Sequence, residues 1–262
     1  MTESAVQVVP EVDPPAQREH HFFNAAGALQ WVLSVIVIAA FVMTFIVQAF
    51  VIPSESMENT LLIGDYLLVD KIDYANGGFW SPFLPYTKID RGDIVVFHYP
   101  IHPAQHFVKR VIGVPGDRIH LLNKQVFVNG VPLIEGYTTY RSTQPNFYRD
   151  DFPDTRYIDG NVDSHWWIQM RKLIEDGNLI VPEGYYFVMG DNRDESLDSR
   201  YWGFVPRDNI EGRPLLIYWS MKRESTDDTD ETQQNAKLTK VGNEFRRAWQ
   251  DIRWNRTMKI VR

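Results

Sequence analysis

The hydrophobic pattern of the chain begins with one long uncharged stretch. No Asp, Glu, Lys or Arg occurs between Glu19 and Glu55, and apolar side chains dominate residues 25–52. About 20 apolar residues suffice to cross a bilayer, so residues 29–50 alone are long enough. A buried core helix is one alternative; a cleaved signal peptide, whose apolar region has only about 7–15 residues, is the other. The pattern predicts one transmembrane helix over residues 25–52.

The rest of the chain alternates between short apolar runs and turn residues. Such runs, separated by Gly-Asp, Pro-Gly-Asp and Asn-Gly turns, are typical of β-strands. Asn129-Gly130, between Val128 and Val131, predicts a two-residue hairpin. The fold is therefore predicted to be mainly β, a barrel or sandwich that follows the N-terminal helix. The expected strands are 66–69, 93–97, 107–112, 125–128, 185–189 and 215–219.

Three segments do not follow this β pattern. Residues 1–24 contain several prolines and little apolar content, which predicts a disordered tail. Residues 135–180 are rich in aromatic and charged side chains and predict an insertion with a short helix over 164–176. Residues 222–262 predict a polar linker and then a basic, aromatic C-terminal tail, either on an anionic membrane surface or packed on the domain. The β-rich domain is accordingly expected to span residues 53–221.

Composition and spacing argue against several kinds of site. The net charge of -7 opposes nucleic-acid binding, because phosphate contacts require a positive surface. The absence of cysteine removes disulfides, thiol catalysis and thiolate metal sites. His98, His102 and His106 have a spacing that would align metal ligands on a helix, but Pro100 and Pro103 prevent such a helix. We expect these to be surface histidines, and no metal site.

The candidate chemistry rests on serine and lysine. Ser54 and Ser56 come directly after the predicted helix. A serine hydroxyl is a poor nucleophile until a base takes its proton, and none of the histidines has a sequence context that suggests this role. Lys109 lies in the apolar run 107–112, where burial would lower the pKa of its ammonium group. A lysine that points outward from a half-buried strand would fit the same pattern.

Four separated motifs follow the apolar stretch. They read Pro-Ser-Glu-Ser-Met-Glu-Asn-Thr-Leu at 53–61, Arg-Gly-Asp-Ile-Val-Val-Phe at 91–97, Lys-Arg-Val-Ile-Gly-Val-Pro-Gly-Asp at 109–117 and Gly-Asp-Asn-Arg-Asp-Glu-Ser-Leu-Asp-Ser-Arg at 190–200. In this order, they resemble the motifs of bacterial signal peptidase I, a membrane-bound serine endopeptidase with a Ser-Lys dyad. The resemblance leaves the 135–180 insertion and the C-terminal tail uncovered.

The resemblance implies a catalytic role for each matching residue. Ser56 would be the nucleophile, and Lys109 would be the general base that later protonates the leaving amine. The backbone N–H of Ser56 and the hydroxyl of Ser54 would form the oxyanion hole. Ser196 would orient the Lys109 amine through a hydrogen bond, as the third member of a triad does. Asp198 and Arg200 would pair and brace the loop that carries Ser196, and no cofactor is implied.

A substrate pocket is implied as well. The family cuts after small residues in an Ala-x-Ala pattern, and the substrate is expected to bind as an added β-strand. One departure from the family pattern is Asn59, which stands where proline is usual. Without the proline, the sequence does not predict how rigid this turn is. The matching positions suggest Ile52, Met57, Leu61, Phe107 and Val108 for the first pocket, and Phe50, Leu67 and Val96 for the third.

The implied partners are secretory signal peptides and the lipid bilayer. No nucleic-acid partner is expected, and the sequence predicts no oligomeric state. The N-terminal tail would be cytoplasmic, and the catalytic domain would lie outside the plasma (inner) membrane. Two alternatives are a Ser-Lys self-cleaving regulator of the repressor type and a non-catalytic, membrane-anchored binding protein on the same core. The first would lack a membrane span and carry a DNA-binding domain. The second would be expected to have lost Ser56 or Lys109, and both are present.

Overall fold

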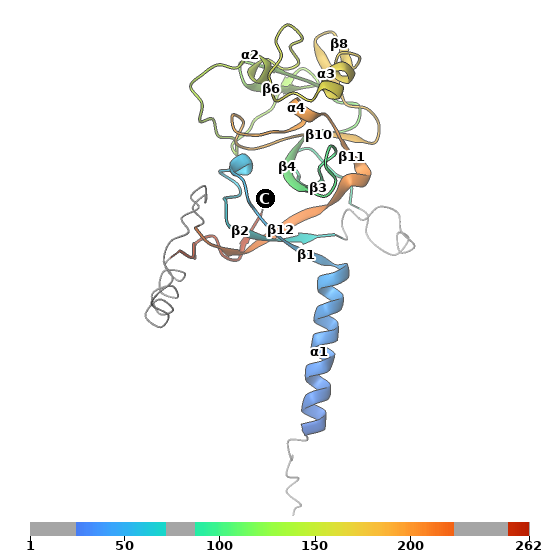
Figure 1. Cartoon of the computed structure of the whole chain (residues 1–262), viewed down its shortest axis with the longest axis vertical. Coiled ribbons are helices and arrows are strands. Elements are labelled where there is room, and N and C mark those ends of the chain that lie inside the picture. The colour runs from blue at the N-terminus through green and yellow to red at the C-terminus, as the bar shows by residue number, and fades with distance from the viewer. Residues whose placement is uncertain (1–24, 72–86, 223–250, 262) are drawn as a thin grey trace, which may run out of the picture. The chain divides into compact units, whose positions relative to one another are not determined.

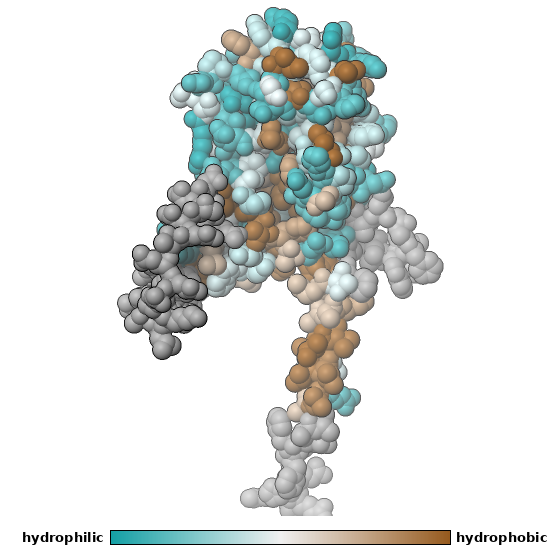
Figure 2. All heavy atoms as spheres, in the orientation of Figure 1, coloured by the Kyte–Doolittle hydropathy of each residue, from teal (hydrophilic) through white to brown (hydrophobic). Residues whose placement is uncertain are grey.

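The N-terminal element is a long apolar helix. The computed structural model describes residues 25–71, 87–222 and 251–261, so the predicted tail over 1–24 lies outside the described residues. Helix α1 (Ala25–Phe45) contains an uncharged window, Gly27–Thr44, with a mean hydropathy of 2.1. Figure 2 shows mostly apolar side chains on the visible face of this helix. By length and composition α1 can cross a bilayer.

The helix ends earlier than predicted. Residues Val47–Val51 form strand β1, which pairs antiparallel with β2 (Asp65–Asp70). The expectation of helix as far as Ile52 was therefore wrong in its last turns. A membrane helix and a half-buried strand are both apolar, so apolar content does not mark the point at which one gives way to the other.

Among the described residues, the larger of two sheets has eight strands, and all its pairs are antiparallel (Figure 1). Its order is β1-β2-β12-β3-β4-β10-β11, and β13 pairs with β12. The remaining strands are β3 (Ile94–His98), β4 (His106–Gly113), β10 (Tyr185–Met189), β11 (Val205–Pro206), β12 (Ile210–Ser220) and β13 (Lys259–Ile260). This order places β4, the strand of Lys109, between β3 and β10.

Strand β12 curls the larger sheet. It pairs with both β2 and β3, and its register shifts near Gly212 and again after Pro214. Such bulges bend a strand and increase its twist, and a bulge also tolerates a proline, which has no N–H to donate. A Cβ atom at Gly212 would overlap the carbonyl oxygen of Asp70. Only glycine therefore allows the close approach of the two strands.

The smaller sheet has the order β7-β6-β5-β9-β8. The predicted hairpin at Asn129-Gly130 is confirmed, because the two residues join β6 and β7 with φ values of 54° and 78°, as a type I′ turn requires. The 135–180 segment adds two strands to this sheet, and its predicted helix is the shorter α3 (Ser164–Met170). The strands are β5 (Arg118–Leu122), β6 (Gln125–Val128), β7 (Val131–Pro132), β8 (Ile174–Glu175) and β9 (Asn178–Ile180).

The described part of the C-terminal tail packs on the β domain. Strand β13 pairs with β12, and Ile252 is buried. Arg256 Nη2 donates to Asp65 Oδ2 at 2.6 Å. Of the two placements expected for the tail, residues 251–261 follow the packed one. Residues 223–250 lie outside the described residues.

The buried apolar side chains form two clusters, and the fold is mainly β, as predicted. The larger cluster lies around β4, β5 and β10 and includes aromatic residues from the 135–180 segment. The smaller one packs under the turn that carries Ser56. The short elements are η1 (Glu55–Met57), α2 (Phe147–Asp150), α4 (Ser199–Trp202) and η2 (Arg207–Asn209). The smaller cluster consists of Ile52, Met57, Leu61, Leu67, Val69, Ile94, Val96 and Ile217.

Candidate active site

Ser56 lies on a short turn between β1 and β2. The turn begins where Ile52 N–H donates to the carbonyl oxygen of Asp65 at 2.9 Å, and η1 follows directly. The N–H groups at the start of such a helix have no partner within it. Ser56 therefore presents its backbone N–H and its hydroxyl from the same buried turn.

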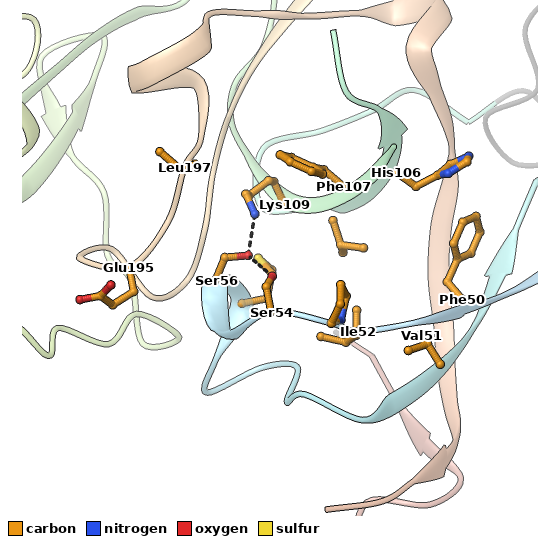
Figure 3. A pocket seen from close by; sticks show the side chains of 13 residues that line it. Phe50, Val51, Ile52, Ser54, Ser56, His106, Phe107, Lys109, Glu195 and Leu197 are labelled. Carbon is orange, nitrogen blue, oxygen red and sulfur yellow. Dashed lines mark hydrogen bonds between the residues drawn. The ribbon is translucent and has the colours of Figure 1, made fainter. Parts of the chain in front are cut away.

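Lys109 on β4 meets this turn. Its Nζ donates a hydrogen bond to Ser56 Oγ at 2.6 Å, and Ser54 Oγ lies 3.3 Å from Ser56 Oγ. Figure 3 shows Lys109 pointing at Ser56 from strand β4, with Ser54 next to Ser56. The three side chains come from two segments that are far apart in the sequence, and the fold brings them into direct contact.

The amine of Lys109 is buried beside an aromatic ring. The residue is only 4% exposed, and its Nζ lies 5.4 Å from the centroid of the Phe107 ring. Burial lowers the pKa of the amine to about 8, although the charges of Asp198 and Asp191 oppose this shift. A lysine with such a pKa is partly neutral near physiological pH and can accept a proton.

The loop that follows β10 packs against the serine turn. Asn192 N–H donates to the carbonyl oxygen of Ser56 at 3.1 Å. A Cβ atom at Gly190 would overlap this carbonyl oxygen and the hydroxyl of Ser196, so glycine is required for the loop to close. Ser196 is buried, but its hydroxyl has no hydrogen-bond partner in the described part of the chain. The expected hydrogen bond from Ser196 to the Lys109 amine is thus not formed here.

Asp198 and Arg200 form a buried bidentate pair in the same loop. Arg200 Nε donates to Asp198 Oδ1 at 2.9 Å, and Arg200 Nη2 donates to Asp198 Oδ2 at 2.8 Å. Burial alone would raise the pKa of Asp198, but the charge and hydrogen bonds of Arg200 and the N–H of Gly190 hold it below its ordinary value. The pair was expected from the sequence, and the structure places it inside the protein, not at the surface.

A second buried ion pair was missed in the sequence. Arg110, next to Lys109, donates to Asp191 through Nε at 2.8 Å and through Nη2 at 2.7 Å. Thr60 Oγ1 donates to the same carboxylate. The contact ties β4, the loop after β10 and the serine turn together. Its residues lie inside three of the matched motifs, and this position was the one indication of the pair in the sequence.

The unusual Asn59 has a structural explanation. Its φ is 84°, a left-handed conformation that asparagine tolerates and that proline, fixed near −65°, cannot adopt. Asn59 Nδ2 donates to the carbonyl oxygen of Tyr137 at 3.0 Å. The start of the 135–180 segment therefore holds the turn at the position where the family usually has proline.

A cavity of about 300 Å³ opens beside Ser56 and Lys109. Phe50 and His106 lie at its far end from this pair (Figure 3). Of the expected pocket residues, Phe50, Ile52, Met57, Phe107 and Val108 line the cavity. Leu61, Leu67 and Val96 do not, because they are fully buried in the cluster behind it. Lining residues that the sequence did not indicate are Val51, Pro53, His106, Glu195 and Leu197.

The chain is similar to known proteins over most of its length. The family model described as Signal peptidase, peptidase S26 matches residues 26–219. A signal peptidase I of Aquifex aeolicus is 38% identical over 223 residues, which cover 72% of this chain and 82% of the relative. One from Pseudomonas fluorescens is 35% identical over 201 residues, covering 68% and 66%. A solved signal peptidase I structure from Enterococcus faecalis V583 is 33% identical, covers 48% of this chain and 97% of its own, and has a TM-score of 0.32.

The class that follows is a serine peptidase of the membrane-associated type. The chain belongs to the signal peptidase family, peptidase S26. It is therefore a hydrolase of peptide bonds, and its apolar helix α1 fits membrane anchoring. This family membership sets aside both the repressor-type regulator and the non-catalytic binding protein.

Proposed function

We propose that this enzyme removes N-terminal signal peptides from secretory preproteins by Ser-Lys chemistry. The observation that carries the proposal is the 2.6 Å contact between the buried Lys109 amine and the Ser56 hydroxyl. The match to the signal peptidase family supplies the substrate class. No metal or cofactor takes part in the proposed reaction.

In the first half of the reaction, Ser56 Oγ attacks the carbonyl carbon of the scissile peptide bond. The neutral amine of Lys109 takes the hydroxyl proton as the new C–O bond forms. Lys109 then passes this proton to the leaving nitrogen, and the C–N bond breaks. The mature protein departs with a free amine, and the signal peptide stays on Ser56 as an ester.

In the second half, water replaces the leaving amine. Lys109 takes a proton from the water molecule, whose oxygen attacks the ester, and the Ser56 oxygen leaves with the proton returned by Lys109. In both halves the negative charge on the carbonyl oxygen would be met by the Ser56 N–H and the Ser54 hydroxyl. Such donors are worth about 3–4 kcal/mol each in the transition state.

The geometry around the cavity supports binding of an extended substrate. Strand β10 pairs with β4 only from Arg110 onward, whereas β3 pairs with β4 from His106. The stretch 106–109 is therefore free to accept a substrate strand on the side away from β3. The apolar cavity at the end of that stretch would take the small side chains of an Ala-x-Ala sequence. With substrates of this class, the catalytic domain would lie on the extracytoplasmic side of the membrane.

The proposal is tested by cleavage of a purified preprotein with an Ala-x-Ala site in detergent micelles. The wild-type enzyme should cut after the second alanine, and Ser56→Ala and Lys109→Ala should each abolish cutting. The matched controls are Ser142→Ala and the exposed Lys88→Ala, which lie outside the cavity lining and should cut at the wild-type rate. Substantial turnover by folded Ser56→Ala, or cutting at other sites, would contradict the proposal.

A further inference from the structure

Three side chains with metal-ligand chemistry meet at the edge of the candidate active site. His98 ends β3, His106 begins β4 as its direct cross-strand partner, and Glu211 lies on β12, the other neighbour of β3. His98 Nε2 lies 2.9 Å from Glu211 Oε1, and His106 Nε2 lies 3.3 Å from the same oxygen. The ligand atoms of all three groups fall within 4.8 Å of one another.

The hydrogen bonds around this trio leave a place for a cation. His98 Nδ1 lies 2.8 Å from the carbonyl oxygen of Pro103, an acceptor that fixes the ring proton on Nδ1. In the neutral ring, Nε2 then carries a lone pair that faces the carboxylate oxygen of Glu211. A lone pair and a carboxylate oxygen 2.9 Å apart need a positive charge between them, which either a proton or a metal ion supplies.

Glu211 has further capacity to bind. Its second oxygen, Oε2, is buried and has no hydrogen-bond partner in the described residues. A buried carboxylate oxygen without a partner is costly, and a bound ion would relieve that cost. The side chains of His98, His106 and Glu211 are 38%, 30% and 19% exposed, so an ion in solution can reach them.

The sequence suggested His98 and His106 as metal ligands only on a helix, so no metal site was expected. The spacing of His98, His102 and His106 suggested one face of a helix, which the intervening prolines exclude. The three histidines instead lie on a hairpin, which pairs His98 with His106. His102 is exposed and packs its ring against Tyr99, outside the trio. The third member, Glu211, is remote in sequence.

We propose that His98, His106 and Glu211 bind a divalent transition-metal ion of the zinc type. Imidazole nitrogen favours zinc and its neighbours over magnesium and calcium, which prefer oxygen alone. Ligands about 2.0–2.1 Å from a tetrahedral zinc ion lie roughly 3.3 Å apart. This matches the 3.3 Å between His106 Nε2 and Glu211 Oε1 and is longer than the 2.9 Å between His98 Nε2 and the same oxygen. Two histidines and one glutamate fill three positions and leave the fourth for water.

The bond between His98 Nδ1 and Pro103 adds the support that metal-binding histidines usually have. A ring N–H that donates to a backbone carbonyl fixes the tautomer and raises the basicity of the other nitrogen. Asn209 Nδ2 also donates to the carbonyl oxygen of His98 at 3.1 Å, which holds the backbone of the ligand. His106 lines the cavity and lies 5.2 Å from Phe50, ring to ring. The ion would thus lie at the wall of the substrate cavity.

The test uses the untagged full-length chain in detergent, titrated with Co²⁺ and then with Zn²⁺ in competition. We expect the intense visible absorption of four-coordinate Co²⁺ at one equivalent per chain, and its loss when zinc displaces cobalt. His98→Ala and Glu211→Gln should each weaken zinc binding by about 100-fold or more, given that loss of a supporting group alone costs about 10–100-fold. His102→Ala is the matched control and should bind like the wild type.

Two outcomes would overturn the proposal. One is the absence of stoichiometric binding at micromolar metal, which would mean that a proton alone satisfies the contact between His98 and Glu211. The other is binding that His102→Ala weakens as much as His98→Ala does. Thermal unfolding of each variant shows whether a loss of binding reflects unfolding, and Glu211→Gln retains the size of the side chain if the alanine variant does not fold. Neither readout requires catalytic activity.

Discussion

Lys109 and Arg200 are both buried cations near the same loop, but the protein holds them in opposite ways. Arg200 shares two hydrogen bonds with Asp198; burial would lower its pKa, but the charge of Asp198 raises it above the ordinary value. The hydrogen-bond partner of Lys109 is the hydroxyl of Ser56, and burial lowers its pKa to about 8. One cation is thus kept charged, and the other is allowed to lose its proton.

The difference comes from what surrounds each group. The Arg200 guanidinium also donates through Nη2 to the carbonyl oxygen of Arg193 at 2.8 Å. Tyr148 and Trp166, from the 135–180 segment, donate to the backbone carbonyl oxygen of Arg200 at 2.5 and 3.0 Å. The full set of partners makes Arg200 a brace for the loop. Lys109 faces a cavity and has no carboxylate at hydrogen-bond distance among the described residues, so its amine is free for chemistry. Burial lowers the pKa of a cationic side chain enough to make it a base only where no carboxylate is hydrogen-bonded to it.

The largest expected effect separates the roles of the two cations. Lys109→Met should reduce cleavage by roughly 10²–10⁴-fold or more, because the general base is lost. The same change should stabilise the fold at pH 7, since the native pKa of about 8 lies below that of the unfolded chain and the buried amine costs stability at every pH below the unfolded value. Cleavage assays and chemical unfolding at pH 7 measure both.

A matched control for Lys109→Met is Lys124→Met, because Lys124 is paired with Asp194 at 2.9 Å. This variant should keep its activity and lose stability. If Lys109→Met were less stable than the wild type at pH 7, burial of the Lys109 amine would not destabilise the folded protein. The contrast with Arg200 would then be wrong.

The second effect concerns stability alone. Asp198→Asn should destabilise the protein by about 3–5 kcal/mol, because it leaves the buried Arg200 charge without its partner. The double variant with Arg200→Met should recover a large part of that loss. The exposed pair of Arg118 and Glu175 is the control, and Glu175→Gln should cost less than about 1 kcal/mol. A loss of this small size for Asp198→Asn would show that the pair does not brace the loop.

Much of the candidate active site could be predicted because its residues lie in contiguous motifs. The motifs indicated Ser56, Lys109 and the Asp198–Arg200 pair, and the turn residues located six of the thirteen strands in the described residues. The geometry between motifs could not be read in the same way. Leu61, Leu67 and Val96 are apolar at matching positions, yet they lie behind the cavity and not in its wall. Alternation along a strand does not say which buried face borders a cavity.

Contacts between segments that are distant in the sequence could not be predicted either. The contact of Asn59 with Tyr137, and the meeting of His98 with Glu211, join segments that no local pattern connects. Both arise from the order of strands in the sheets and from how the 135–180 segment folds back. The end of α1 at Phe45 could not be predicted for the same reason, because the pairing of β1 with β2 sets it and the composition does not.

The third effect is the dependence of cleavage on pH. The base must be neutral, so the rate should fall about tenfold per pH unit as the pH drops below the Lys109 pKa of about 8. The charge of Asp198 raises this pKa and that of Arg200 lowers it. In Asp198→Asn the first influence is lost while the second remains. Its acid limb should therefore move to lower pH than in the wild type.

The measurement is the cleavage rate from pH 5 to 9 at subsaturating substrate, at a temperature where the variant stays folded. Glu175→Gln, whose exposed charge is screened by solvent, should leave the limb in place. A wild-type rate that is flat down to pH 5 would mean that Lys109 is not the base. A limb that moves to higher pH in Asp198→Asn would mean that the two buried cations do not act on each other through Asp198, and the contrast between them would then rest on solvation alone.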